Sequence, residues 1–449
     1  MPDQPASGDP FADLIEPFSR RGVDLGLDRI QAALAELGHP ERRFAAVQVA
    51  GTNGKGSICT LVHQALLAAG IRAGLYTSPH LVSWTERIRL GDSVIAAPAL
   101  RRLLESATPI ARRHQLTPFE LVTAAAFLAF AEADLELVVL EVGLGGRLDA
   151  TTCHPSRNVI GFASVGIDHT EFLGPDPASI AAEKAGVLQR GAVAISAPQS
   201  PEVAAVLDQQ ATAVGAELRW VEPLDLGRWP LGLPGAVQAT NSAVALGMLR
   251  ALGERGWPID EAAIRRGFAA ARWPGRLQPL LWHGHPLLLD GAHNLPAASA
   301  LRAELDAHPD RHGLMPAPRH WVLGILANKQ GPAILEALLA PVDRAWIVPV
   351  AGHPCWSQAE LAAACPALAN QLQAAAGLED GLDQAHHGEA GSPRPVLVAG
   401  SLYLIGQLLA ENRFHQLPPA QAKPSTETTQ LLPLAIAAGQ SEIPGLAPP

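Results

Sequence analysis

The segment from Gly51 to Ser57, Gly-Thr-Asn-Gly-Lys-Gly-Ser, has the composition of a phosphate-binding loop. Glycines let backbone N–H groups crowd around an anion, and a helix that begins after such a loop adds unpaired donors and partial positive charge. Lys55 could bind the β- and γ-phosphates, and Ser57 could reach a phosphate or its metal ion. The strict Walker pattern is not met, because Val49 stands at its first glycine position and Gly56 follows the lysine. The alternative is a glycine-rich turn with a solvated lysine, and the pattern favours phosphate binding over it.

Acidic and imidazole side chains follow two further predicted strands. Glu141 comes directly after the apolar run 135–140, and Asp168 and His169 follow the run 159–165. Magnesium takes oxygen ligands and keeps several waters, so a carboxylate that faces a phosphate loop suits a metal-bound nucleotide. A turn or helix cap is the weaker interpretation of Glu141. For His169, contact with a metal or phosphate and a structural hydrogen bond are equally supported.

Three other groups carry weaker signals. Lys184 lies in a predicted helix, where a lysine is usually solvated. Asp290, His293 and Asn294 follow another predicted strand and could contact a nucleotide or form a capped turn. Arg276 lies at a predicted junction and could bind a phosphate or cap a helix.

The elements that must position these residues alternate between strands and helices. Such alternation predicts parallel β–α–β winding, in which ligands bind beyond the carboxyl ends of the strands. Thr117 is expected to cap a helix that Pro118 begins. Residues 84–90 are expected to be extended, and 198–235 show no clear pattern. Helices are predicted over 24–37, 58–69, 99–114, 176–188, 241–252 and 260–271, and strands over 47–50, 74–76, 135–140, 159–165 and 192–197.

The alternation restarts after Trp273–Arg276. Strands are predicted over 286–289, 320–326, 345–350 and 396–399, with helices over 296–306, 333–339, 358–368 and 403–411. Residues 375–394 are expected to form a long loop, and 1–10 to be disordered. The predicted fold class is α/β: a P-loop NTPase-like parallel-sheet domain over 1–274, a smaller Rossmann-like domain over 275–415, and a flexible tail over 416–449.

Composition narrows the function classes. The 449 residues carry a formal net charge of −10, which argues against nonspecific binding to nucleic acid or an anionic membrane. The four cysteines show no C-x-x-C spacing, as expected for idle thiols in a reducing compartment. The N-terminus shows no export signal, and the apolar run 121–131 is too short to span a bilayer. A cytoplasmic protein is therefore predicted.

Taken together, these segments resemble the Mur ligase superfamily and specifically its folate branch, the dihydrofolate synthase/folylpolyglutamate synthase enzymes. The loop at Gly51–Ser57 is shared with the cell-wall ligases, whereas the run Leu140–Thr151 is specific to the folate branch. The resemblance covers residues 24 to 410. Further matching motifs are Tyr76–Leu81, Thr85–Ile88, Asp168–Thr170, Leu173–Gly174, Glu183–Gly186, Pro274–Arg276 and Asp290–Asn294.

The resemblance implies an ATP-dependent amide ligase. Such enzymes add L-glutamate to dihydropteroate, to the γ-carboxylate of reduced folates, or to both, through an acyl phosphate, and release ADP and phosphate. We predict both activities in one monomeric enzyme whose partners are small molecules only. The implied cofactors are ATP, Mg²⁺ at two sites and a monovalent cation.

Residue roles follow from the resemblance position by position. The catalytic set is Lys55, Lys184 (which the family carbamylates) and His293. The Mg²⁺ ligands are Ser78, Glu141 and His169. The ATP contacts are Gly51, Thr52, Asn53, Gly54, Lys55, Gly56, Ser57, Asn241, Arg276 and Asp290, with ATP expected between the two domains. The pterin contacts are Thr117, Pro118, Phe119, Glu120, Leu148, Asp149 and Ala150. Ser401, with His293, is expected to shape the cleft from the second domain.

The chain also departs from the family pattern. Asn328-Lys329 stands where the family often has Asp-Lys, and 352–356 lacks an arginine that often follows the next strand. The alternatives are a monofunctional synthase of either kind, a cell-wall Mur-type ligase, or a P-loop phosphotransferase or switch protein. The phosphate loop begins already at Gly51, without the uridine-nucleotide domain that precedes it in cell-wall ligases, which counts against that alternative.

Overall fold

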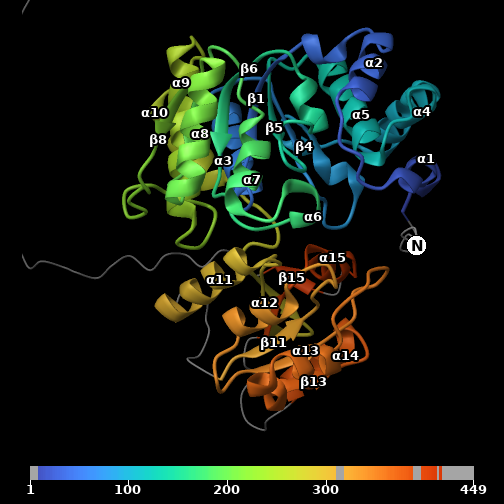
Figure 1. Ribbon diagram of the computed structural model, residues 1–449, viewed down its shortest axis with the longest axis vertical. Helices are drawn as coiled ribbons and strands as arrows, with labels where there is room; N and C mark the ends of the chain where they lie inside the picture. Colours follow the sequence, from blue (N-terminus) through green and yellow to red (C-terminus); the bar gives the residue numbers. More distant parts are fainter. Residues whose placement is uncertain (1–8, 310–317, 388–395, 412–413, 417–449) are drawn as a thin grey trace, which may run out of the picture. The chain divides into compact units, whose positions relative to one another are not determined.

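The computed structural model describes residues 9–309, 318–387, 396–411 and 414–416. They belong to one compact unit, Met1–Gln416, which contains two β-sheets flanked by helices (Figure 1). Residues 1–8 and residues 417–449 of the predicted flexible tail lie outside the described residues, whereas Gln416, the first residue of that predicted tail, ends strand β15 (Phe414–Gln416) and pairs with Leu280. Asp9 and Pro10, also predicted to be disordered, accept hydrogen bonds from Trp84 and Arg101.

The first sheet has eight strands in the order β4-β3-β2-β5-β1-β6-β7-β8. Its central strands β2, β5, β1, β6, β7 and β8 are parallel, and only β3 and β4 run antiparallel to their neighbours. The strands are β1 (Ala45–Ala50), β2 (Ala73–Tyr76), β3 (Ile88–Leu90), β4 (Ser93–Val94), β5 (Leu137–Glu141), β6 (Arg157–Phe162), β7 (Val193–Ser196) and β8 (Glu217–Trp220).

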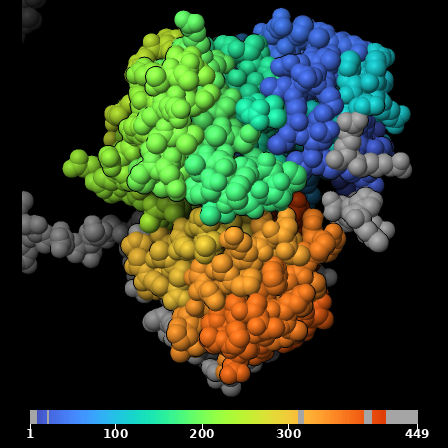
Figure 2. Space-filling view, in the orientation of Figure 1, coloured from blue at the N-terminus to red at the C-terminus, as the bar shows by residue number. Residues whose placement is uncertain are grey.

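Helices cover both faces of this sheet. The helices are α1 (Ala12–Ile15), α2 (Asp28–Glu36), α3 (Lys55–Ala68), α4 (Ala97–His114), α5 (Pro118–Glu132), α6 (Thr170–Leu173), α7 (Pro177–Ala185), α8 (Pro201–Val214), α9 (Gln238–Glu254) and α10 (Glu261–Ala270). Short 3₁₀ turns occur at η1 (Glu16–Arg21), η2 (Pro40–Arg42), η3 (Trp84–Arg87) and η4 (Ala150–Cys153). Helix side chains, with α7 and α8 in green, form the visible surface over the sheet (Figure 2).

The alternation of side chains along β1 shows how the layers are held together. Val47 and Val49 are buried against α3, α9 and α10, whereas Ala46 and Ala50 contribute to clusters on the opposite face. Because successive side chains of a strand point to opposite faces, a strand that is apolar throughout must be covered on both. The central strands therefore fix the loops that follow them against a packed core.

The second sheet has seven strands in the order β13-β12-β11-β14-β10-β9-β15, of which β9 and β15 are antiparallel to their neighbours. The strands are β9 (Gln278–Trp282), β10 (His285–Leu289), β11 (His320–Leu323), β12 (Arg344–Ile347), β13 (Leu372–Ala374), β14 (Val396–Ala399) and β15 (Phe414–Gln416). Its helices are α11 (Leu295–Ala307), α12 (Gly331–Leu338), α13 (Gln358–Ala364), α14 (Leu378–His387) and α15 (Leu402–Ala410), with the 3₁₀ turn η6 (Pro366–Gln371).

Several predicted elements were wrong in detail. Residues 84–90 are extended only from Ile88, because Ser83 and Glu86 form a capping box that closes a 3₁₀ turn first. The described part of the predicted loop 375–394 contains helix α14, with apolar Leu378, Leu382 and Ala385 buried against the sheet. Strand β6 begins at Arg157 and ends at Phe162, earlier than expected.

The second sheet also differs from expectation, because the antiparallel strand β9 precedes β10. Asp290 therefore follows the second strand of that sheet and not the first. No helix within the described ranges combines the length and the hydropathy that crossing a membrane requires.

Helix α10 packs on α3 at Gly267, and this contact gives a stability prediction. A Cβ at Gly267 would lie 2.4 Å from backbone atoms of Ala65. Backbone cannot move aside as a flexible side chain can, so Gly267→Ala should lower the free energy of unfolding by about 1–3 kcal/mol. Urea denaturation followed by tryptophan fluorescence measures this as a lower midpoint at unchanged slope.

Gly253→Ala is the matched control, since Gly253 lies in α9 with no atom within 4 Å of its added Cβ. It should leave stability unchanged or raise it by up to about 1 kcal/mol through helix propensity. Equal midpoints for the two variants would contradict the close packing of α10 on α3.

Candidate active site

The polar residues predicted to do chemistry follow neighbouring strands of the first sheet. Gly51 follows β1, Ser78 lies two residues beyond β2, and Glu141 ends β5. Strand order β2-β5-β1-β6 and the pairing of Val49 with Glu141 place these three strand ends side by side. The sheet therefore gathers the phosphate loop, Ser78 and Glu141 at one edge, as its parallel winding predicts.

The phosphate loop leads directly into helix α3. The helix begins at Lys55, earlier than the expected residue 58, so Lys55, Gly56 and Ser57 form its first turn. Gly54 precedes it with φ of 96° and no side-chain cap, and a Cβ there would lie 2.3 Å from Asn241 Oδ1. The first-turn N–H groups are thus left for an anion, and only glycine fits beside Asn241.

Two lysines converge on the carbonyl oxygen of Gly51. Lys55 Nζ donates to it at 3.1 Å and Lys184 Nζ at 3.0 Å, and Lys55 also donates to Thr52 O at 3.1 Å. Lys184 is buried, although its helix position predicted a solvated side chain. Burial, together with repulsion from Lys55, lowers the pKa of Lys184 to about 7. A lysine in this state is partly a neutral amine near pH 7.

Ser78 and Glu141 form a pair of oxygen donors that fits a magnesium ion. The Ser78 N–H donates to Glu141 Oε2 at 3.2 Å, and the buried Ser78 hydroxyl has no hydrogen-bond partner among the described residues. Burial raises the pKa of Glu141 to about 7, with Lys55 and the Ser78 N–H acting in the opposite direction. A buried hydroxyl without a partner is costly, and a cation would satisfy both groups.

His169, the third predicted ligand, directly precedes α6 at its N-cap position, in a left-handed conformation at φ of 52°. Its side chain is 41% exposed, and its pKa is lowered by burial and by Lys329 and Lys55 against the opposing effect of Asp168. No group of three or more His, Cys, Asp or Glu side chains is gathered for a metal in the described ranges. A site built from Ser78, Glu141 and His169 would thus need water or phosphate oxygens as well.

A network that sequence reasoning did not assign lies next to His169. Asp168 accepts hydrogen bonds from Lys329 Nζ and, at 2.8 Å, from Asn294 Nδ2. Asn294 also exchanges amide hydrogen bonds with Asn53 of the phosphate loop, at 3.0 and 3.2 Å. Burial raises the pKa of Asp168, but His169 and Lys329 outweigh it and hold the pKa well below its usual range. In the sequence, the feature that pointed to this network is that Asp168, Asn294 and Lys329 each follow a strand.

The predicted pterin contacts come together around Gly143. A Cβ at Gly143 would lie 2.6 Å from the Phe119 ring and 3.2 Å from Asp149 Oδ2, so both segments pack on this glycine. Asp149 accepts the N–H groups of Gly143, Leu144 and Thr151. Burial raises the pKa of Asp149.

The capping box of α5 occupies two other predicted pterin contacts. Glu120 Oε2 accepts the Thr117 N–H, and the Thr117 hydroxyl accepts the Glu120 N–H. Phe119, Leu148 and Ala150 therefore remain the less polar candidates for ring contact, with Pro118 in the first turn of the helix.

Three of the predicted ATP contacts, Asn241, Arg276 and Asp290, come from later parts of the sequence, and each interacts with neighbouring protein groups. Asn241 lies inside α9, which begins at Gln238 and not at Asn241 as expected, and it donates to Gln238 at 3.0 Å. Arg276 is close enough to Glu141 to lower its pKa. Asp290 accepts the N–H groups of Leu277 and Ala292, at 3.0 and 2.9 Å.

Two residues of the second sheet complete the predicted set. His293 Nδ1 lies 2.7 Å from Gly291 O, and burial lowers the pKa of His293 to about 4. Ser401 is buried and caps α15 by accepting the Tyr403 N–H at 3.1 Å. These contacts fix both side chains in place.

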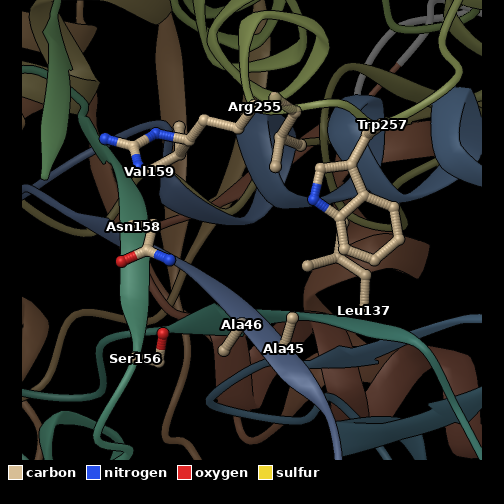
Figure 3. A pocket seen from close by; sticks show the side chains of 9 residues that line it. Ala45, Ala46, Leu137, Ser156, Asn158, Val159, Arg255 and Trp257 are labelled. Carbon is tan, nitrogen blue, oxygen red and sulfur yellow. The ribbon is translucent and has the colours of Figure 1, made fainter.

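A cavity of about 370 Å³ lies elsewhere, at the amino ends of strands β1, β5 and β6 (Figure 3). Arg255 and Trp257 approach it from the segment after α9, opposite Ser156 and Asn158. The phosphate loop follows the carboxyl end of β1, so this cavity is separate from the predicted site. The other lining residues are Ala45, Ala46, Leu137, Val159 and Leu252.

Comparison with known proteins agrees with the architecture. Residues 276–411 match the family model "Dihydrofolate synthetase, C-terminal domain". The chain is 31% identical to the dihydrofolate synthetase of Saccharomyces cerevisiae, over 88% of this chain and 99% of that protein. It is 36% identical to the dihydrofolate synthase/folylpolyglutamate synthase of Escherichia coli, over 75% of this chain and 81% of that protein.

A solved structure of a related enzyme has a similar fold. The bifunctional folylpolyglutamate synthase/dihydrofolate synthase of Yersinia pestis, complexed with AMPPNP and a manganese ion, aligns with a TM-score of 0.77. The alignment has 30% identity and covers 91% of this chain and 99% of that one. With the phosphate loop, the paired oxygen donors and these similarities in view, the chain belongs to the dihydrofolate synthase/folylpolyglutamate synthase family of ATP-dependent ligases.

Proposed function

We propose that this enzyme joins L-glutamate both to dihydropteroate and to the γ-carboxylate of reduced folates. The observation that carries the proposal is the convergence of Lys55, the first turn of α3 and Glu141 at one sheet edge, beside the Phe119 segment. Phosphate-binding and metal-binding groups thus adjoin a surface that suits an aromatic ring. The domain boundaries at 274 and 415 and the residue roles given above belong to the same proposal.

The chemistry explains why these residues are needed. A carboxylate is a poor electrophile, so one of its oxygens first attacks the γ-phosphorus of ATP, and the bond to the departing ADP breaks. The glutamate amine then attacks the carbonyl carbon, loses a proton, and inorganic phosphate leaves. Lys55 and the α3 N–H groups reduce the repulsion between two anions that must meet. A Mg²⁺ held by Ser78, Glu141 and His169 would supply further charge neutralisation.

The first test is glutamate-dependent phosphate release from Mg-ATP, run separately with dihydropteroate and with a reduced folate monoglutamate. We expect release with both acceptors and only when glutamate is present. Release with one acceptor would reduce the enzyme to a monofunctional synthase. A stable phosphorylated acceptor formed without glutamate would instead identify a phosphotransferase.

Lys55→Ala should abolish phosphate release with either acceptor, because it removes the cation of the first α3 turn that offsets the negative charge of the γ-phosphate. We expect a loss of at least about 100-fold in kcat, as for other preorganised groups that stabilise a transition state. Arg228→Ala, which removes an 83% exposed cation, is the control and should retain full activity. Near-normal turnover of Lys55→Ala would refute the role of the loop.

Glu141→Gln tests the metal site. The amide keeps the shape of the side chain but lacks its charge, so the Mg²⁺ concentration for half-maximal activity should rise about tenfold or more. Glu132→Gln removes an exposed carboxylate that pairs with Arg102 and should leave this concentration unchanged. An unchanged Mg²⁺ requirement in Glu141→Gln would exclude Glu141 as a ligand.

We further propose that Lys184 is carbamylated. An ammonium cannot ligate a cation, whereas a carbamate offers oxygens, and the buried amine with its pKa lowered to about 7 is a nucleophile for carbon dioxide. At fixed dissolved carbon dioxide, the carbamate should increase as the pH rises through about 7, because the neutral amine increases.

The carbamate is measured as a ¹³C NMR signal after incubation with ¹³C-bicarbonate. The signal should be absent from Lys184→Arg, which retains a cation but cannot be carbamylated under these conditions. Wild-type enzyme with full activity and no carbamate signal would contradict the proposal.

The proposed location is the cytoplasm, where ATP and folate substrates are present. All four cysteines are free, which is consistent with a reducing compartment. The monomeric state and a monovalent cation remain predictions, to be checked by sedimentation velocity and by exchanging potassium for choline in the activity assay.

A further inference from the structure

Arg87 is a buried cation that the chemistry described above does not use. It is 9% exposed and closes η3, immediately before strand β3. Strand β3 pairs with β2 so that Ile88 lies opposite Tyr76, and the Thr77 N–H donates to Arg87 O at 3.0 Å. Arg87 is thus fixed beside the carboxyl end of β2, where the segment containing Ser78 begins.

The contacts of the Arg87 side chain are with neutral groups. Its Nε donates to His80 Nδ1 at 2.9 Å, and its guanidinium carbon lies 4.3 Å from the centre of a Trp84 ring. Tyr76 interacts with the guanidinium through its hydroxyl. The described part of the chain offers Arg87 no carboxylate within the 4.0 Å of an ion pair. A charged group is rarely buried without a counter-charge, so an anion is the partner that this site lacks.

Arg157, on strand β6, is a structural buried arginine that likewise has no carboxylate partner among the described residues, so the comparison turns on how its donors are used. It is 6% exposed, and its guanidinium donates to three oxygens: Gln48 Oε1 at 2.5 Å, His154 O at 2.9 Å and Val187 O at 3.1 Å. Arg87, by contrast, bonds to one ring nitrogen and one hydroxyl and lies against an aromatic face, with the Tyr403 phenol acting on its charge as well. Its five donors are therefore less fully used by the protein.

Arg87 interacts with a residue at each end of the proposed acceptor site. On one side, Tyr76 bonds through its hydroxyl to Thr123 of α5 at 2.9 Å, and its ring centre is 6.1 Å from that of Phe119. On the other side, Glu141 is close enough to act on the charge of Arg87. Arg87 thus interacts with residues at both the ring end and the metal end of the proposed site.

We propose that Arg87 binds the carboxylate of dihydropteroate that becomes phosphorylated. One carboxylate oxygen accepts hydrogen bonds from the guanidinium, which leaves the second oxygen to attack the γ-phosphorus. The inference rests on the proposed function and adds to it the residue that recognises the acceptor anion. Arginine suits this role because its planar donors match a carboxylate and its charge persists when buried.

The surrounding segment holds the guanidinium in position before substrate arrives. Glu86 accepts the N–H groups of Leu81, Val82 and Ser83 at 2.7–2.8 Å, which fixes the turn between His80 and Trp84. His80 packs on Trp84 at 4.7 Å between ring centres, and burial lowers the pKa of His80 to about 3. A neutral His80 keeps Nδ1 as an acceptor for Arg87, so the cation is not repelled.

The test compares Arg87→Met with wild type in two measurements. In steady-state assays, the KM for dihydropteroate should rise by about 30-fold or more, as expected when a desolvated charged partner is removed, with little change in the KM for ATP. Arg89→Met is the matched control: Arg89 lies two residues later, in strand β3, and donates to Asp92 O at an exposed position, so its loss should leave both KM values unchanged.

The second measurement is direct binding of dihydropteroate and of its carboxamide analogue by titration calorimetry. Wild type should prefer the carboxylate by about 30-fold or more, and Arg87→Met should bind the two ligands equally. A variant that only disturbed the fold would weaken both ligands alike and keep the preference. Arg87→Lys retains the charge without the planar fork, and it should show an intermediate preference if Arg87→Met does not fold.

The outcomes separate this inference from the proposed function. Wild-type enzyme without phosphate release for either acceptor would refute the function itself. Active wild type, combined with an unchanged carboxylate preference in Arg87→Met or Arg87→Lys, would refute the role of Arg87 and leave the function standing.

Discussion

The site depends on unbalanced positive charge held at the ends of parallel strands. Lys55 and Lys184 donate to the same carbonyl oxygen, that of Gly51, and the first turn of α3 adds N–H groups without a side-chain cap. Burial, and after it repulsion from Lys55, lowers the pKa of Lys184 to about 7, so a second full positive charge beside Lys55 is disfavoured. An anion at the loop relieves the strain of assembling these groups, so the fold favours a phosphate-bearing ligand.

This charge could not be assembled on an isolated loop. The central strands are buried on both faces, which fixes the direction in which each chain segment leaves the sheet. The pairing of Val49 with Glu141 brings the carboxylate beside the phosphate loop, and the neighbouring strand β2 brings Ser78 to the same edge. The order of the strands in the sheet thus determines which side chains come together, although these residues are far apart in the sequence.

Sequence reasoning succeeded where local pattern determines structure. The β–α alternation predicted parallel strands, and the Thr117–Glu120 capping box was recognisable from its spacing alone. It failed at 84–90, because the cap formed by Ser83 and Glu86 competes with an extended chain, and at 375–394, because the apolar residues of α14 are sparse within a polar segment. The short strands β9 and β15 could not be predicted from their own composition. They are strands because they pair antiparallel with neighbouring strands of the sheet.

The candidate site residues also divide into those that a local sequence pattern predicts and those that depend on contacts between distant segments. The glycines, Lys55 and Glu141 could be proposed from the sequence because each stands at a strand end, where its chemistry suits a nucleotide or its metal ion. The partnership of Asp168 with Asn294 and Lys329 could not, since it joins segments 126 and 161 positions apart and depends on side-chain geometry. Arg87 is a similar case. In the sequence it is one of two arginines in a run that was predicted to be extended. Its burial among neutral partners is what distinguishes it from Arg89. Arg157 is also buried without a counter-charge, but its donors are bonded to three protein oxygens. Where a buried cation lacks both a counter-charge and such acceptors, as Arg87 does, we infer that the missing anion belongs to the ligand.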